Sequence, residues 1–422
     1  MGIKIFMFSF IITSILFFFL FIPTRLTTQI STLKPSTMNY FNIITTNKTY
    51  PITFAYLISA SKGDVVRLKR LLKVLYHPNN YYLIHMDYDA PDSEHKDVAE
   101  YVANDHVFGQ VGNVWIVGKP NLVTYRGPTM LATTLHAMAM LLRTCHWDWF
   151  INLSASDYPL VTQDGMVSVL NKLLCYVIYA IWIDQYLYLI QVFSEVPRDI
   201  NFIQHSSHLG WKLNKRGKPM IIDPGLYSLN KSEIWWIIKQ RNLPTSFKLY
   251  TGSAWTIVSR SFTEYCIMGW ENLPRTLLLY YTNFVSSPEG YFQTVICNSQ
   301  GYKNTTANHD LHYITWDNPP KQHPRSLGLK DYRKMVLSSR PFARKFKRND
   351  IVLDKIDRDL LKRYKGGFSF GGWCSKGGKN KSCSDLRAEN YGLLKPGPGS
   401  RRLKNLLKKI LADRFFRQMQ CR

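Results

Sequence analysis

The amino-acid sequence predicts a three-layer α/β sandwich behind an N-terminal transmembrane helix and a stem. From residue 52 onward, apolar runs of strand length alternate with segments of helical spacing, a pattern typical of α/β proteins. Before them lies an uncharged apolar run of 18 residues, Ile5 to Ile22. The chain has 422 residues, of which 45% are hydrophobic, and this indicates a folded protein with one large domain or two subdomains.

The N-terminal apolar run is long enough to span a bilayer. A cleavable signal peptide would have a shorter apolar core followed by small residues, whereas Phe21, Ile22 and Pro23 close this run. The expected parts are a cytoplasmic tail at 1–4, a signal anchor at 5–22, a stem rich in Thr, Ser and Asn at 23–50, and a lumenal domain at 51–422.

Positive charges flank the apolar run on both sides, so they do not determine the orientation of the anchor in the membrane. The expected orientation is therefore taken from glycosylation motifs. Four Asn-X-Ser/Thr motifs follow the anchor and predict a lumenal, glycosylated domain. They begin at Asn47, Asn230, Asn304 and Asn380. A fifth motif, at Asn152, lies in an apolar run of strand type, so we expect it to be buried and unglycosylated.

The alternation of elements within the domain begins directly after Pro51. Strands are predicted at 52–60, 81–87, 113–117 and 149–155, and helices at 64–76 and 128–143. Strand, helix and strand in succession form βαβ units, and sheets built from such units bind their ligands at the carboxyl ends of the strands. We therefore expect the functional residues to gather at that edge.

The seven cysteines are compatible with disulfides in an oxidising lumen. Cys374 and Cys383 are the favoured pair, because the Gly/Lys/Ser loop between them is short and flexible. A zinc site is the weaker alternative, since the sequence has neither a CxxC spacing nor a nearby pair of histidines.

The positive charge of the chain is concentrated near its C-terminus. The formal net charge is +25, and residues 321–422 hold 28 Lys and Arg against 8 Asp and Glu. Anionic headgroups, a nucleoside diphosphate or an acidic glycan are the expected partners. Nucleic acid is excluded as a partner, because the predicted domain is lumenal and carries no nucleic-acid-binding motif.

A resemblance to a known family rests on several separated runs of the sequence. They are AYLISASKGD, YLIHMD, WDWFINLSASDYPLVTQD, PRDINFIQHSSHLGWK, LYTGSAWTIVSRSF, NLPRTLLLYYTNFVSSPEGYFQTVICN, KQHPRSL and RPFARKFKRND. From about Pro51 to the C-terminus the chain resembles the plant branch of the core-2/I-branching glycosyltransferases. Within that branch it is most similar to the β-glucuronosyltransferases that act on arabinogalactan proteins.

This resemblance implies a GT-A-like fold and a single-pass type II protein of the Golgi membrane. It implies an inverting enzyme that moves glucuronic acid from UDP-glucuronic acid to the β-galactan side chains of arabinogalactan proteins. Two alternatives stay open, namely transfer of N-acetylglucosamine and an inactive, glycan-binding relative.

The resemblance also implies the residues of the site. In SSPEGYFQT, Glu289 matches the catalytic base, which removes the proton of the attacking hydroxyl. Arg325 and Lys345 match the residues that bind the donor diphosphate in place of a metal ion. No metal and no cofactor besides the UDP-sugar is expected, and we interpret Asp87-Tyr88-Asp89 as unrelated to metal binding.

Further residues are expected to border the ligands. The candidates for acceptor binding are Asp157, Trp211, Trp255, Trp316 and Asp317. Ala55, Tyr56 and Asp87 are expected at strand ends, beside the base and ribose of the donor.

One segment departs from the family pattern. The apolar residues 171–192 stand where the family runs almost directly from VTQDGMVSVL to FSEVPRDINFI. A second membrane span is rejected, because it would separate two halves of one sheet and because Lys172 and Asp184 interrupt it. Either the segment is a surface insertion, or, as we hypothesise, it comes from an error in the gene model, in which untranslated intervening sequence was included as coding sequence. A dominant transcript that encodes it would exclude the second interpretation.

Overall fold

The computed structural model describes residues 52–167, 198–227, 233–319, 321, 323–369, 371–374 and 388–421. The chain divides into two compact units, Met1–Thr49 and Tyr50–Arg422, and every described residue belongs to the second. The predicted tail, anchor and stem, and the segment 171–192, lie outside the described residues. Within the described ranges, no helix has the length and apolar character needed to cross a membrane.

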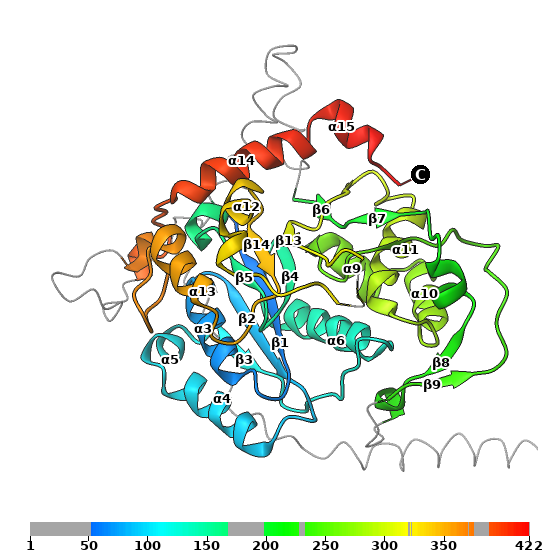
Figure 1. Ribbon diagram of the computed structural model, residues 1–422, viewed down its shortest axis with the longest axis horizontal. Helices are drawn as coiled ribbons and strands as arrows, with labels where there is room; N and C mark the ends of the chain where they lie inside the picture. The colour runs from blue at the N-terminus through cyan, green and yellow to red at the C-terminus, as the bar shows by residue number, and fades with distance from the viewer. Residues whose placement is uncertain are drawn as a thin grey trace, which may run out of the picture. The chain divides into compact units, whose positions relative to one another are not determined.

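A mixed sheet of seven strands forms the centre of the second unit (Figure 1). Its order is β12 (Thr306–Ala307), β6 (Asn201–Phe202), β11 (Ile257–Ser259), β4 (Trp149–Ser154), β1 (Phe54–Ala60), β2 (Tyr81–Met86) and β3 (Val114–Ile116). Strands β4, β1, β2 and β3 run parallel, whereas β11 is antiparallel to both β4 and β6. The four strands predicted from the sequence are β1, β2, β3 and β4, whereas β6 and β12, which also pair in parallel, were not predicted.

Both predicted helices are present. They are α3 (Val65–Leu75), between β1 and β2, and α6 (Thr129–Thr144), between β3 and β4. Two further helices that we did not predict, α4 (Asp92–Asn104) and α5 (His106–Val111), join β2 to β3. Helix α4 buries only Val98, and therefore its sequence lacks the apolar periodicity from which a helix could be predicted.

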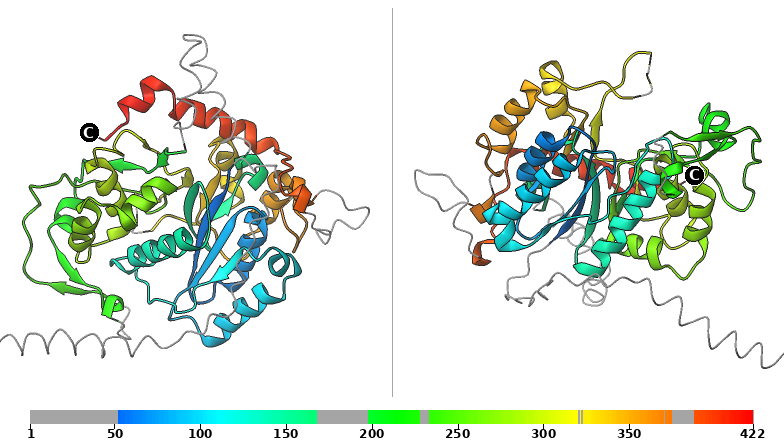
Figure 2. Two further views of the ribbon diagram at one scale, coloured as in Figure 1. Left: turned by 180° about the vertical axis from the view of Figure 1, so that it is seen from behind. Right: turned by 90° about the horizontal axis from the view of Figure 1, so that it is seen from below.

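Helices cover both faces of the sheet because side chains alternate along each strand. Phe54, Tyr56 and Ile58 of β1 point into one core, together with the buried side of α3. Ala55 and Leu57 point into the other core, together with α6. The views in Figure 2 show the sheet between these two helical layers.

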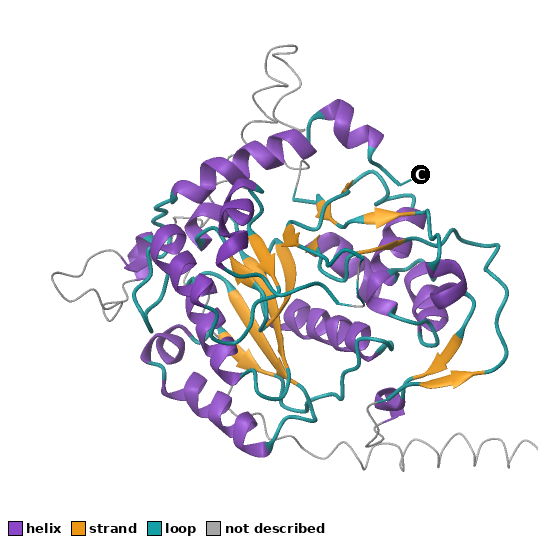
Figure 3. Ribbon diagram, viewed as in Figure 1, coloured by secondary structure: helices purple, strands orange, loops and turns teal. Residues whose placement is uncertain are grey.

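The remaining helices extend the two layers, as Figure 3 shows. On the α6 side lie α9 (Arg260–Met268), α10 (Leu273–Tyr281) and α11 (Tyr291–Asn298). On the α3 side lie α12 (Tyr332–Leu337), α13 (Ile351–Ile356) and α14 (Pro398–Ile410). The chain ends in α15 (Asp413–Gln418), and shorter helices are η1 (Leu213–Gly217), η2 (Pro224–Tyr227), η3 (Ser287–Glu289), η4 (Leu329–Asp331), η5 (Asp357–Leu361), η6 (Gly372–Cys374) and η7 (Ala388–Asn390).

Three small sheets lie outside the central one. The first has three strands in the order β13 (His312–Ile314), β14 (Phe342–Arg344) and β5 (Tyr158–Pro159). The second pairs β10 (Thr251–Gly252) with β7 (His205–Ser206), and the third pairs β8 (Met220–Ile222) with β9 (Trp235–Ile237). The first of them joins the basic C-terminal part to the loop after β4, since β14 pairs with β5. The carboxyl end of a central strand and the basic region are thereby brought together.

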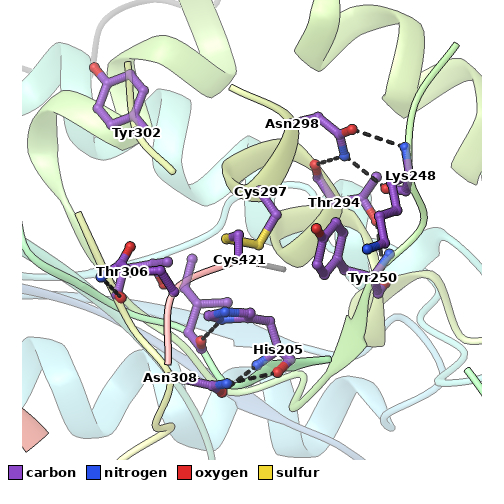
Figure 4. Close-up of a disulfide and its surroundings, with 12 residues drawn as sticks. His205, Lys248, Tyr250, Thr294, Cys297, Asn298, Tyr302, Thr306, Asn308 and Cys421 are labelled. Carbon is purple, nitrogen blue, oxygen red and sulfur yellow. Dashed lines mark hydrogen bonds between the residues drawn. A yellow bond between two sulfur atoms is a disulfide. The ribbon is translucent and has the colours of Figure 1, made fainter. Parts of the chain in front are cut away.

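A disulfide joins Cys297, at the end of α11, to Cys421, near the end of the chain (Figure 4). The two cysteines are 124 residues apart in sequence, and this pairing was not predicted. Cys374 is also disulfide-bonded, but Cys383 lies outside the described residues, so their pairing stays a prediction. Cys145 and Cys266 are free.

The predicted glycosylation motifs differ in exposure. Asn304 is exposed, as glycosylation requires. Asn152 is buried, as predicted, and its amide is bonded to Ala254 and Thr256. Asn47, Asn230 and Asn380 lie outside the described residues.

The disulfide generates a stability prediction. Replacing Cys421 by Ser removes a link that closes a long loop, so the free energy of unfolding should fall by about 2–4 kcal/mol. Denaturant unfolding of oxidised protein measures the change, and Cys145→Ser is the control. Equal stability of wild type and Cys421→Ser would contradict the disulfide as a stabilising link.

Candidate active site

Glu289 lies in η3, immediately before α11, and is bonded by side chains from two distant segments. The hydroxyl of Tyr125 donates to its Oε1 at 2.8 Å. The ammonium of Lys212 lies 3.3 Å from Oε2, and the guanidinium of Arg216 donates to the same oxygen. Three donors therefore fix a carboxylate whose side chain is only 15% exposed.

The backbone around Glu289 packs against the C-terminal end of α10 and the residues that follow it. Ser287 is fully buried, and its hydroxyl lies within hydrogen-bonding distance of the carbonyls of Tyr281 and Phe284. At Gly290, an added Cβ would lie 2.7 Å from the hydroxyl of Tyr281. A residue with a side chain does not fit at Gly290, and so the turn that carries Glu289 packs directly on α10.

The electrostatic environment keeps Glu289 ionised. Burial acts to raise the pKa of its carboxyl, but the charges of Arg216 and Lys212 and the hydrogen bonds from Arg216 and Tyr125 outweigh it. The resulting pKa is below the ordinary value for Glu. Burial and the neighbouring Glu289 raise the pKa of Tyr125, which therefore stays a hydroxyl donor.

A buried carboxylate, Asp223, holds the loop that carries Tyr125. It accepts hydrogen bonds from the hydroxyls of Thr124 and Thr129, at 2.9 and 2.7 Å, and from the backbone N–H of Thr129. Gly127 lies so close to it that an added Cβ would be 2.0 Å from its Oδ2. Asp223 thus fixes the segment 124–129, which leads into α6.

A second cluster forms around Arg344 at the end of β14. Its guanidinium lies 3.7 Å from the ring centroid of Trp255, and its Nε lies 3.3 Å from Oδ1 of Asp157. The other oxygen of Asp157 accepts from the backbone N–H and hydroxyl of Ser154. Asp157 and Trp255, which we expected to bind the acceptor, are therefore almost fully buried and hold Arg344.

The charges of three cations reach His323. Burial lowers the pKa of this histidine, and the charges of Lys345, Arg126 and Arg344 lower it further. Arg344 also acts on the pKa of Tyr125, the partner of Glu289. The charge of Arg344 thus reaches both Tyr125 and His323.

The segments that carry Arg325 and Lys345 are joined by a backbone hydrogen bond. The N–H of Leu327 donates to the carbonyl of Lys345 at 2.8 Å. The guanidinium of Arg325 is bonded to both carboxylate oxygens of Asp331, and these bonds are the first cause of the lowered pKa of Asp331. A diphosphate bound by Arg325 would share this guanidinium with Asp331.

Trp211, Trp316 and Asp317 lie at the surface of the protein. Trp211 is 65% exposed, with the guanidinium of Arg216 at 5.4 Å from its ring. Trp316 is 51% exposed, and Asp317 lies 4.0 Å from Lys321. Arg216 thus contacts both Trp211 and Glu289, and acceptor binding by Trp211 stays a prediction.

We expected Ala55 and Tyr56 to lie at strand ends, and this prediction is wrong. Both lie inside β1 and are fully buried, and the Tyr56 hydroxyl donates to Gln163. Asp87 follows directly after β2, as expected. Its Oδ1 accepts from the backbone N–H of Asp89, and burial raises its pKa.

Side chains within bonding distance of a common metal ion occur once among the described residues, at His205, Cys297 and Cys421. The two sulfur atoms are joined in the disulfide (Figure 4). Thiolates are the form that binds metal, and so the oxidised pair does not form a metal site.

Sequence reasoning missed Tyr125, Arg126, Lys212, Arg216 and Asp223. The spacing of Lys212 and Arg216, four residues apart after Trp211, was a visible signal of two cations on one side of a helical turn. No local signal linked either of them to Glu289, 77 and 73 residues away.

The chain belongs to the Core-2/I-Branching enzyme family, whose model matches residues 54–179 and 180–336. The mixed central sheet with its flanking helices is consistent with a GT-A-like fold. The resemblance inferred from the sequence is confirmed.

Among individual relatives, Beta-glucuronosyltransferase GlcAT14A of Arabidopsis thaliana is 52% identical over 373 residues, covering 88% of this chain and 78% of that protein. Beta-glucuronosyltransferase GlcAT14C of the same plant is 45% identical over 380 residues, covering 90% and 87%. Human Xylosyltransferase 2 is 27% identical over 337 residues, covering 75% of this chain and 35% of that protein.

The cations beside Glu289 generate a prediction about pH dependence. In Arg216→Gln the lowering charge is lost while burial remains, so the pKa of Glu289 should rise. If Glu289 is the base that the sequence predicts, it works only when deprotonated, and the acidic limb of kcat/KM should move to higher pH. The measurement is a pH profile of transfer activity. Arg143→Gln, in the last turn of α6 and far in sequence from Glu289, is the control and should leave the acidic limb of kcat/KM unchanged.

Gly127 generates a prediction about positioning. The new methyl group in Gly127→Ala would displace either Asp223 or the loop that carries Tyr125, and kcat/KM should fall by roughly tenfold to a hundredfold. The matched control is Gly118→Ala, where an added Cβ meets no atom within 4 Å. Steady-state kinetics and thermal unfolding are compared for both variants, and equal kcat/KM would contradict the role of Asp223.

Proposed function

We propose that the protein is an inverting glucuronosyltransferase that transfers glucuronic acid from UDP-glucuronic acid to β-galactan chains of arabinogalactan proteins. The observation that carries the proposal is the ionised, largely buried Glu289, held by Tyr125, Lys212 and Arg216 beside a second group of cations. The relatives at 45% and 52% identity are named as β-glucuronosyltransferases, which supports glucuronic acid as the sugar.

Glu289 is the proposed general base. It takes the proton of the acceptor hydroxyl while the hydroxyl oxygen forms a bond to the anomeric carbon. The bond from that carbon to the diphosphate oxygen breaks on the opposite face, and UDP leaves with the electron pair. A carboxylate oxygen has two acceptor sites, and Oε1 is bonded by Tyr125 alone among the described residues. Its second site suits the acceptor hydroxyl.

The leaving diphosphate is proposed to bind Lys345 and Arg325. Fixed positive charge stabilises the negative charge that develops on the leaving oxygen. Arg344 adds a third cation, positioned by Asp157 and Trp255. On this basis the reaction proceeds without a metal ion and without a cofactor other than the UDP-sugar.

The proposed location is the Golgi membrane, with residues 5–22 as a single type II anchor and the catalytic domain in the lumen. The apolar run and the disulfide between Cys297 and Cys421 support this location. The exposed glycosylation motif at Asn304 agrees with it.

A transfer assay tests the proposal. Purified protein is offered UDP-glucuronic acid, UDP-N-acetylglucosamine or UDP-xylose, with β-galactan oligosaccharides and EDTA. We expect transfer of glucuronic acid that survives EDTA and falls by about 10²- to 10⁴-fold in Glu289→Gln, which keeps the shape of the side chain but not the base.

Two further proteins serve as controls in this assay. A chain without residues 171–192 separates the effect of that segment from the chemistry, and Arg143→Gln controls for the loss of a surface charge. Preferred use of UDP-N-acetylglucosamine would replace the proposed donor. Binding of glycan without transfer from any donor, by folded protein, would favour the inactive relative.

A further inference from the structure

Arg126 lies beside the turn that carries the proposed base. Its carbonyl accepts a hydrogen bond of 2.7 Å from the N–H of Ser286, three residues before Glu289. Its neighbour Tyr125 donates to the Glu289 carboxylate. Two hydrogen bonds therefore tie the segment 125–126 to the turn that carries the base.

The charge of Arg126 extends toward the other group of cations. Arg126, Lys345 and Arg344 all act on His323. The backbone of Arg126 thus contacts the turn that carries Glu289, and the charge of its side chain reaches His323, as do the charges of Lys345 and Arg344. An anionic group of a sugar bound near these residues would be attracted by this charge.

The loop that carries Arg126 is anchored on both sides. Thr124 precedes it and Thr129 follows it, and both are bonded to the buried Asp223. Since Gly127 also packs against Asp223, the backbone at Arg126 has little freedom to move. A recognition residue is most selective when its support is rigid.

The other nearby cations have different positions. Lys212 and Arg216 are paired with Glu289, and Arg344 is held against Asp157. Arg126 is exposed and therefore accessible to a ligand. A hexuronate donor carries one more negative charge than a neutral hexose donor, and a guanidinium fits a carboxylate with two parallel hydrogen bonds.

We propose that Arg126 binds the carboxylate of the sugar in a hexuronate donor and so selects a uronic acid over a neutral hexose. The inference rests on the proposed glucuronosyltransferase function and adds the residue that determines the donor. Arg126 is accordingly a specificity residue, distinct from Glu289, which acts on the acceptor, and from Lys345, which acts on the diphosphate.

Binding measurements on the purified full-length protein test this role. Dissociation constants of UDP-glucuronic acid, UDP-glucose and UDP are measured by calorimetry for wild type, Arg126→Gln and Arg126→Lys. In Arg126→Gln the affinity for UDP-glucuronic acid should fall by roughly tenfold to a hundredfold, while the affinities for UDP-glucose and UDP stay unchanged. Arg126→Lys keeps the charge but not the planar fork, and should lose less.

Arg143→Gln is the matched control, because it removes an exposed arginine at the opposite end of α6. An equal loss of affinity for all three ligands in Arg126→Gln would make Arg126 a diphosphate ligand and overturn the inference. Unchanged affinity for UDP-glucuronic acid in that variant would also overturn it. A wild-type protein that binds UDP-glucuronic acid no more tightly than UDP-glucose would instead overturn the proposed donor itself.

Discussion

A buried carboxylate must be compensated by hydrogen bonds or by opposite charge, and the arrangement around Glu289 follows from this requirement. Its three donors belong to a loop before α6 and to a helical turn after β7. Each of these segments is attached to a different part of the fold. The position of the carboxylate therefore depends on the packing of the whole α6 side of the sheet.

The supports of this constellation are themselves buried polar groups. Asp223 binds Thr124 and Thr129, and Asp157 binds Ser154 and holds Arg344. Because a buried group left without partners costs free energy, each of these carboxylates strongly favours one geometry of its loop. The result is a rigid support for Tyr125 on one side and for Arg344 on the other.

Some of the positively charged residues in the C-terminal part form ion pairs within the fold, and others lie close to the candidate site. Arg363 is paired with the buried Asp357, and this pair stabilises the fold locally. Arg344 and Lys345 are placed by β14 and the segment after it, close to the loop after β4. Two other cations of the site, Lys212 and Arg216, come from the middle of the chain, outside the basic C-terminal part.

The sequence by itself determined the alternation of strands and helices from β1 to β4, because side-chain periodicity is a local property. It also indicated the family and Glu289, since both rest on short runs of residues. Only the tertiary structure decided that Tyr125, Lys212 and Arg216 meet at Glu289, that Asp157 and Trp255 hold Arg344, and that Cys297 pairs with Cys421. Tyr125 and Glu289 are 164 residues apart. Their contact is set by how the layers pack on one sheet, and no local pattern of residues encodes it.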